Sequence, residues 1–261
     1  MEMESGVQSI GRFGVNTISR LGGISVLFLR FLWSLKDIPR SFMLIVDQLY
    51  FVGVRSLPLI VVVSIFVGAV ATWQAAYQFK FIGAPLSFLG HAVGKAVVME
   101  LAPVLSALVY AGRVGAGIAA ELGTMKVTEQ IDALETMGIS PVRYLVMPRV
   151  IGCLFMVPML VVFANFVAIM GGLVVSITGV DISSETFLNG FRDSFQIKDF
   201  LAGMTKAAVF GLLIGVVGCY EGFQAKTGAE GVGQATTNSV VISSVGILVL
   251  NFAFAVLLFR L

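Results

Sequence analysis

Charged residues are scarce in this chain of 261 residues, where Asp, Glu, Lys and Arg together make up 12%. Soluble domains usually contain about 25%. Apolar residues account for 57% instead, so the composition predicts an integral membrane protein. Acidic and basic residues nearly balance, at a net charge of +2, and no basic run is interleaved with aromatic residues. This pattern excludes a nucleic-acid-binding surface.

Histidine and cysteine are almost absent as well. His91 is the single histidine, and both cysteines, Cys153 and Cys219, lie inside apolar runs. No metal-ligand set, disulfide framework or catalytic triad can be assembled from them. The glycine-rich stretch GAEGVGQAT has the spacing of a phosphate-binding loop, but Gln234 stands where that loop needs lysine. We therefore expect a chain that is not an enzyme and binds no cofactor of its own.

Five apolar segments are long enough for the roughly 20 residues of helix that cross a bilayer. They are Leu57–Phe79, His91–Gly123, Val150–Thr178, Phe200–Tyr220 and Val240–Phe259. We predict an all-α protein with one transmembrane helix in each segment. The second segment corresponds to ~50 Å of helix, which exceeds a hydrocarbon core of ~30 Å, so one of its ends projects from the membrane.

The N-terminal segment, residues 1–50, differs from the five-span domain predicted for residues 51–261. Apolar residues recur at helical spacing between Ile10 and Leu35, but arginines interrupt them, which predicts an amphipathic helix at the membrane interface. Six lysines and arginines precede residue 56. By the positive-inside rule the N-terminus is cytoplasmic, and an odd number of spans places the C-terminus on the opposite side.

Between the second and third expected spans, residues 128–138 predict a short amphipathic helix in the cytoplasm. Thr128 is expected to cap it and Gly138 to end it. Its two faces are an acidic one, with Glu129, Asp132 and Glu135, and an apolar one, with Ile131, Leu134 and Met137. An anionic membrane surface would repel three carboxylates, so a protein partner is favoured over the alternative of a helix that lies on the membrane.

Just before this helix, small residues recur every four positions from Ala111 through Gly115 and Ala119 to Gly123. Such rows let helices approach closely within lipid. Static packing and the transmission of force from the short helix into the membrane are both compatible with this row.

Two stretches together carry a family resemblance. They are AGRVGAGIAAELGTMKVTEQIDALETMGISPVRYLVMPR and YEGFQAKTGAEGVGQATTNSVV. They closely resemble the MlaE (YrbE) permeases of ABC lipid transporters, and the likeness extends from about Gln48 to Leu261. The resemblance implies a homodimeric membrane core in the inner membrane of a Gram-negative bacterium. It also implies that this core moves phospholipids between that membrane and the periplasm, and that this transport maintains the lipid asymmetry of the outer membrane.

The resemblance also implies partners. These are a cytoplasmic ABC ATPase (MlaF-like) that binds ATP and magnesium, a STAS-domain accessory protein (MlaB-like) and a periplasmic hexamer of MCE-domain proteins (MlaD-like). Residues 128–138 then resemble the coupling helix that contacts the ATPase. The loop from Glu221 to Gln234 is a second candidate contact, with Glu221 as its acidic residue.

Ionisable residues inside the expected spans are the candidates for a substrate pathway. Glu100 lies ~14 Å into the second span, just before Pro103, where the missing backbone N–H opens the helix. An ionisable group at such depth is a functional candidate, and an internal ion pair is the alternative. Lys95 is expected to meet a lipid headgroup, whereas Arg113 is expected to pair with a carboxylate on another helix.

Two aromatic residues, Trp73 and Tyr77, either border a lateral opening or form an ordinary aromatic belt. One departure from the family pattern is Met99, which occupies a position where some relatives carry arginine. A headgroup contact by that arginine cannot be carried over. Two other functions remain alternatives to a lipid permease: a secondary transporter that couples ions through Glu100 and Arg113, and a membrane scaffold.

Overall fold

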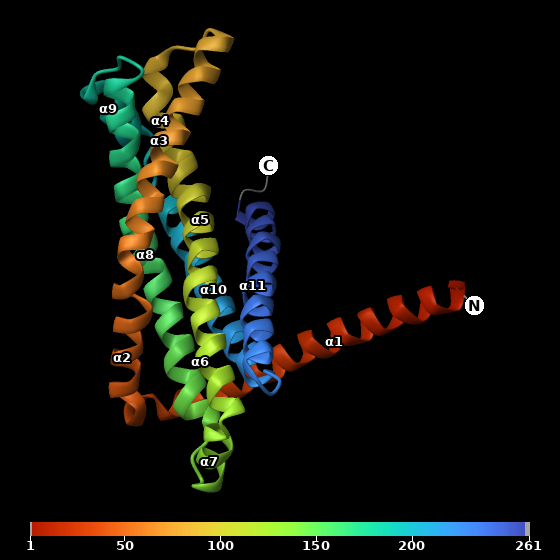
Figure 1. Cartoon of the computed structure of the whole chain (residues 1–261). Coiled ribbons are helices and arrows are strands. Elements are labelled where there is room, and N and C mark those ends of the chain that lie inside the picture. The colour runs from red at the N-terminus through yellow and green to blue at the C-terminus, as the bar shows by residue number, and fades with distance from the viewer. Residues whose placement is uncertain (1, 259–261) are drawn as a thin grey trace.

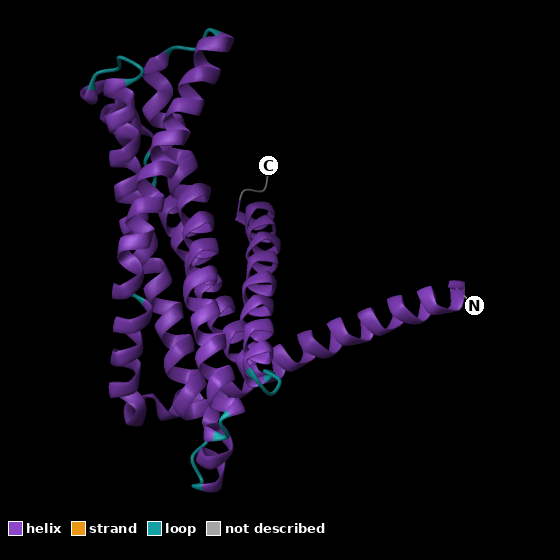
Figure 2. Cartoon of the chain, viewed as in Figure 1, coloured by secondary structure: helices purple, strands orange, loops and turns teal. Residues whose placement is uncertain are grey.

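The computed structural model describes residues 2–258 and consists of helices that run mostly side by side in one elongated bundle (Figure 1). Helix makes up 91% of the structure, and no strand occurs between residues 2 and 258 (Figure 2). The prediction of an all-α protein is confirmed. Within a membrane this is the expected result, because a helix satisfies its own backbone hydrogen bonds where water is absent.

The described residues form eleven α-helices joined by short connections. Their bounds are α1 Glu2–Ser34, α2 Phe42–Val52, α3 Leu57–Ile82, α4 Leu89–Ala96, α5 Ala102–Tyr110, α6 Ala116–Val127, α7 Gln130–Thr136, α8 Met147–Thr178, α9 Ser184–Ser194, α10 Ile197–Phe223 and α11 Ala229–Leu258. Short 3₁₀ turns cover Leu35–Ser41, Val54–Ser56 and Leu86–Phe88, and π-helical turns cover Val97–Leu101, Ala111–Gly115 and Val142–Val146.

Each of the five expected spans corresponds to a long helical segment. These are α3, the continuous α4–α6 rod with its two π-turns, α8, α10 and α11. The start of the last span was predicted wrongly, because α11 begins at Ala229 rather than at Val240. Its first turns are rich in Gln, Thr, Asn and Ser, which lower hydropathy without ending a helix. The loop expected from Glu221 to Gln234 is therefore confined to residues 224–228.

Six stretches of the described chain, rather than five, are long and apolar enough to cross a membrane. The additional one is Ile18–Pro39, which includes the second half of α1. In Figure 1, α1 runs across the direction of the other helices and away from them, while α10 contacts its C-terminal half. This direction favours a helix that lies at the interface, and that assignment stays a prediction.

Two helices were not predicted. Helix α2 continues the line of α3 beyond a bend at residues 53–56 and packs against α8. Helix α9 lies in the connection between α8 and α10, where Ser183 caps it by accepting a hydrogen bond of 3.2 Å from the backbone N–H of Thr186. It packs against α4 and closes that end of the bundle, which we call the α9 end; the opposite end, which carries α7, is the α7 end.

Helix α8 lies at the centre of the bundle, between α3 and α10. Close backbone approach holds α3 against α8: a side chain at Gly68 would overlap the carbonyl oxygen of Ala168, and one at Gly171 would overlap that of Ile65. The row from Ala111 to Gly123 is buried in the same way, against α10 and α11. Such close packing stabilises helices in lipid, where the hydrophobic effect between them is absent.

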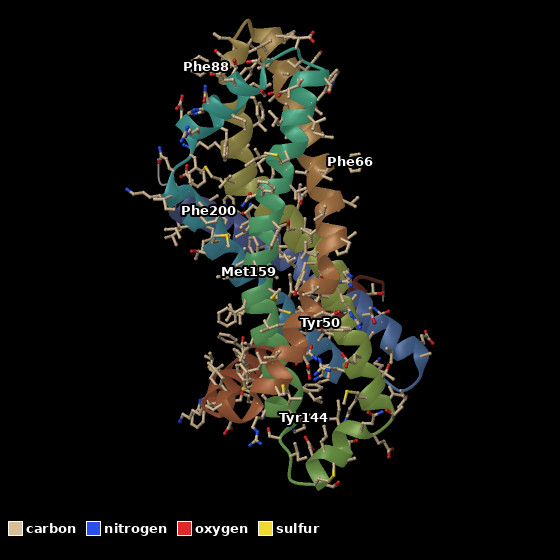
Figure 3. All side chains as sticks on the ribbon, turned by 90° about the vertical axis from the view of Figure 1, so that its left-hand side faces the viewer. Tyr50, Phe66, Phe88, Tyr144, Met159 and Phe200 are labelled. Atoms are coloured by element: carbon tan, nitrogen blue, oxygen red, sulfur yellow. The ribbon has the colours of Figure 1, made fainter. Side chains whose placement is uncertain are left out.

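The outer surface of the bundle is apolar. Figure 3 shows Phe66 and Met159 projecting outward from α3 and α8, and both side chains are exposed. Many other large apolar side chains are exposed along these two helices and α11. A soluble monomer rarely exposes so extensive an apolar surface, so this surface is suited to contact with lipid or with another transmembrane chain.

Candidate functional site

At the α7 end, helices α6, α7 and α8 form a projecting hairpin (Figure 1). The short helix was predicted over residues 128–138, but α7 covers only Gln130–Thr136. Thr128 does not cap it, because its hydroxyl donates to the carbonyl of Thr124 at 2.8 Å and so completes the end of α6. Glu129 adopts a left-handed conformation, with φ of 59°, and forms the corner between the two helices.

The acidic face of α7 is exposed as predicted, with Glu129, Asp132 and Glu135 all open to the outside. Asp132 accepts a hydrogen bond of 2.7 Å from Lys126. The apolar face was predicted only in part. Ile131 is buried and Leu134 is half-buried, whereas Met137 follows the end of α7 and is exposed.

An ion pair that the sequence did not indicate joins the two arms at the base of this hairpin. The guanidinium of Arg149 in α8 lies 2.9 Å from the carboxylate of Glu121 in α6. It also donates to the carbonyl of Leu145 at 2.8 Å, and its side chain is only 6% exposed. Because a planar guanidinium fixes the orientation of its partners, this contact makes the hairpin a braced projection of α6 and α8.

Glu221 was expected in a cytoplasmic loop, and this placement is wrong. The residue lies inside α10, since that helix continues to Phe223, and it is 2% exposed. Its carboxylate is therefore turned into the protein rather than presented on a loop.

Near the α9 end, Glu100 forms an ion pair with Lys206 of α10. Glu100 lies in the π-turn Val97–Leu101, so the local opening expected beside Pro103 is present. Lys206 is 0% exposed and also lies 3.3 Å from the carbonyl oxygen of Met99, whereas Glu100 is 37% exposed. The ion-pair alternative for Glu100 thus has a partner, although part of the carboxylate remains accessible.

The other two intramembrane cations behave differently from each other. Lys95 lies 3.6 Å from Asp199 at the start of α10, so a second charge pair joins the same two segments. Arg113 donates to the hydroxyl of Ser56. No carboxylate pairs with Arg113 within residues 2–258, so its pairing with a carboxylate on another helix stays a prediction.

A groove of about 830 Å³ runs between α3 and the rod formed by α4 and α5. Thirteen of its lining residues are apolar, among them Phe66, Val70 and Leu101, and two are polar, Gln74 and Gln78. Trp73 and Tyr77 do not line this groove, because they project from another face of α3. Glu100 does not line this groove, because its carboxylate is directed at Lys206 of α10.

Comparisons with known proteins agree on one family. The profile of the family described as Permease MlaE matches residues 45–257. A probable ABC transporter permease protein of Rickettsia bellii is 39% identical over 252 residues, which are 97% of each chain. One from Synechocystis sp. is 42% identical over 214 residues, 82% of this chain and 81% of its own. One from Pyropia yezoensis is 35% identical over 243 residues, with 93% and 92% covered. The hairpin, the groove and both charge pairs lie within the matched residues.

Proposed function

This chain belongs to the MlaE family of ABC-transporter permeases, and from that membership we propose that it moves phospholipids as one half of a homodimeric membrane core. Membership of an ABC permease family removes the secondary transporter and the scaffold as alternatives. From this membership we also infer that ATP hydrolysis takes place in a separate subunit, which supplies the ATP and magnesium sites.

The apolar groove between α3 and α4–α5 carries the proposal for a lipid substrate. Its volume of about 830 Å³ lies in the range of ligand sites, which is roughly 300–1,000 Å³. A polar solute would lose its hydrogen bonds to water there and find only Gln74 and Gln78 as replacements. Acyl chains need no such replacement, so an amphiphile is the substrate class that fits.

Partly exposed charged groups near the α9 end are suited to a headgroup. Glu100, in a π-turn, is partly accessible, and Lys95 of α4 is 42% exposed. Neither lines the groove itself, since Lys95 faces Asp199 and α9 and Glu100 faces α10. We infer that the chains of a phospholipid occupy the groove and that its polar part is directed toward the α9 end, where the two charge pairs lie. Trp73 and Tyr77 then form part of an aromatic belt rather than the groove itself.

For the partners, we propose that the acidic face of α7 contacts the ATPase (MlaF-like). The Glu121–Arg149 ion pair supports this role, because a braced hairpin transmits displacement to α6 and α8. A STAS-domain protein (MlaB-like) and a periplasmic hexamer of MCE-domain proteins (MlaD-like) complete the assembly that the family resemblance implies. With α7 in the cytoplasm, the α9 end faces the periplasm of a Gram-negative inner membrane, and the transported lipid maintains the asymmetry of the outer membrane.

Filling the groove tests the substrate assignment. We expect Val70→Trp to lower the amount of phospholipid bound by the reconstituted complex by about tenfold, since displacing two methylene groups costs about 1.6 kcal/mol. Val174→Trp on α8 is the matched control, because the two valines are similarly exposed, at 62% and 59%, and Val174 lies outside the groove. Equal lipid binding by both variants would overturn the assignment of the groove.

A further inference from the structure

A second cavity, of about 600 Å³, lies at the α7 end between α1, the last turn of α10 and the first turns of α11. In contrast to the groove, its walls are mainly polar. Three charged residues line it, Arg20 from α1, Glu221 from α10 and Lys226 from the connection to α11, together with the side-chain amides of Gln224, Gln234 and Asn238. Neither the family membership nor the proposed transport uses this cavity.

Glu221 is the feature of this cavity that needs an explanation. Its side chain is 2% exposed, and its Oε1 atom accepts no hydrogen bond within residues 2–258. A buried carboxylate without a donor is costly, and such groups in folded proteins nearly always have a partner. The carboxylate borders a cavity large enough for a ligand, so a hydrogen-bond donor that enters the cavity would supply the missing partner.

Two cations complete the electrostatics of the cavity. Arg20 and Lys226 are both exposed and line the same space, and within the described residues neither forms an ion pair. The cavity thus offers a buried anion in its wall and two accessible cations. A molecule that matches both must carry a cationic donor close to an anion.

We propose that this cavity binds the headgroup of an aminophospholipid, with the ammonium group at Glu221 and the phosphate at Arg20 and Lys226. A primary ammonium group donates up to three hydrogen bonds, which Glu221 and the neighbouring amide oxygens accept. The phosphate forms charge-assisted hydrogen bonds with the guanidinium and the ammonium of the protein.

The surroundings of the cavity favour a lipid over a soluble zwitterion of the same chemistry. On α1, Val15 and Ile18 are exposed, five and two residues before Arg20. On the other side, only 11% of the most apolar part of α11 is buried, so its exposed surface is available to acyl chains. A headgroup in the cavity would place its chains along these two helices.

Lipid binding to the purified, delipidated full chain in detergent tests the proposal. Native mass spectrometry should show phosphatidylethanolamine binding about tenfold more tightly than phosphatidylglycerol, which has the phosphate but no ammonium. Glu221→Gln should abolish this preference, whereas Lys226→Gln should weaken the binding of both lipids. Glu230→Gln is the matched control, because Glu230 is exposed in the first turn of α11 and does not line the cavity.

A stability measurement distinguishes loss of binding from loss of folding. Because Oε1 of Glu221 is buried without a donor, Glu221→Gln should raise the Tm of the lipid-free chain, by about 2–4 °C. Phosphatidylethanolamine should raise the Tm of the unmodified chain more than that of the variant.

Several results would overturn the proposal. Equal affinity for the two lipids would do so, as would an unchanged preference in Glu221→Gln. If soluble phosphoethanolamine competes with an affinity equal to that of the lipid, the ligand of the cavity is a soluble molecule and not a lipid. If a basic side chain of another polypeptide bonds to Glu221 in the assembled transporter, the cavity is a protein contact and not a lipid site. Because these measurements need neither ATPase nor transport, their failure leaves the proposed function untouched.

Discussion

The carboxylates of the two charge pairs near the α9 end and the two glutamates on the acidic face of α7 are used in opposite ways. Near the α9 end, Glu100 and Asp199 each pair with a lysine across two helices, and Lys206 is wholly buried in doing so. At the α7 end, Glu129 and Glu135 are exposed and form no ion pair within the described residues. The same residue types thus fix helix packing in the Glu100 and Asp199 pairs and remain available to another molecule on α7, and burial of the partner decides between the two roles.

The largest effect is expected at the buried ion pair. Glu100→Gln leaves the ammonium of Lys206 buried without its carboxylate, which should lower the free energy of unfolding by about 3–5 kcal/mol. For a chain of this size the corresponding drop in Tm is about 10 °C. Thermal denaturation of the purified chain in detergent measures it.

Lys206→Met, which changes the other partner of the ion pair, is the control for Glu100→Gln. It removes the buried charge and keeps much of the side-chain volume, while Glu100, 37% exposed, still reaches solvent. We expect a loss of no more than about 1 kcal/mol, since replacing a buried charge by an apolar group is often neutral. A larger loss for Lys206→Met than for Glu100→Gln would show that the carboxylate, not the ammonium, is the costly group.

An intermediate effect is expected at the base of the hairpin. Glu121→Gln removes the charge that faces Arg149, but the guanidinium keeps its hydrogen bond to Leu145, so the loss should be about 1–2 kcal/mol. If the hairpin is a brace, the variant should also reduce ATPase stimulation by lipid while the ATPase remains bound. Unchanged stimulation at a measurably lower Tm would assign the pair to folding alone.

The smallest effect is expected at the more exposed pair of the α9 end. Lys95 and Asp199 are 3.6 Å apart and Lys95 is 42% exposed, so Lys95→Gln should change the free energy of unfolding by no more than about 0.5 kcal/mol. Chemical denaturation in detergent gives this value. A loss similar to that of Glu100→Gln would remove the distinction between buried and exposed pairs within this end.

The sequence predicted the long helices well because continuous apolar runs determine them. It missed α2 and α9, which are short, and it placed the start of α11 too late because polar residues there resemble a loop. It identified Glu100 by its depth but not its partner, since Lys206 lies 106 residues away and only the packing of α10 against the π-turn brings the two together. No local pattern encodes such a contact.

The hairpin illustrates the same limit. Charge and periodicity predicted the exposed acidic face of α7, because these properties depend on neighbouring residues. The position of Thr128, the conformation of Glu129 and the ion pair of Arg149 depend on how α6 ends and where α8 begins. Glu221 was assigned to a loop for the related reason that its helix continues past the apolar run.

The central claim is that the exposed acids of α7 dock on the ATPase, and charge reversal tests it most directly. The affinity of the purified permease for its ATPase should fall by about tenfold, or about 1.4 kcal/mol, in the double variant Glu129→Lys and Glu135→Lys. The matched double variant Glu185→Lys and Asp193→Lys, which reverses two exposed acids of α9, should retain full affinity. Undiminished binding by the α7 variant, at an unchanged Tm, would contradict the docking assignment.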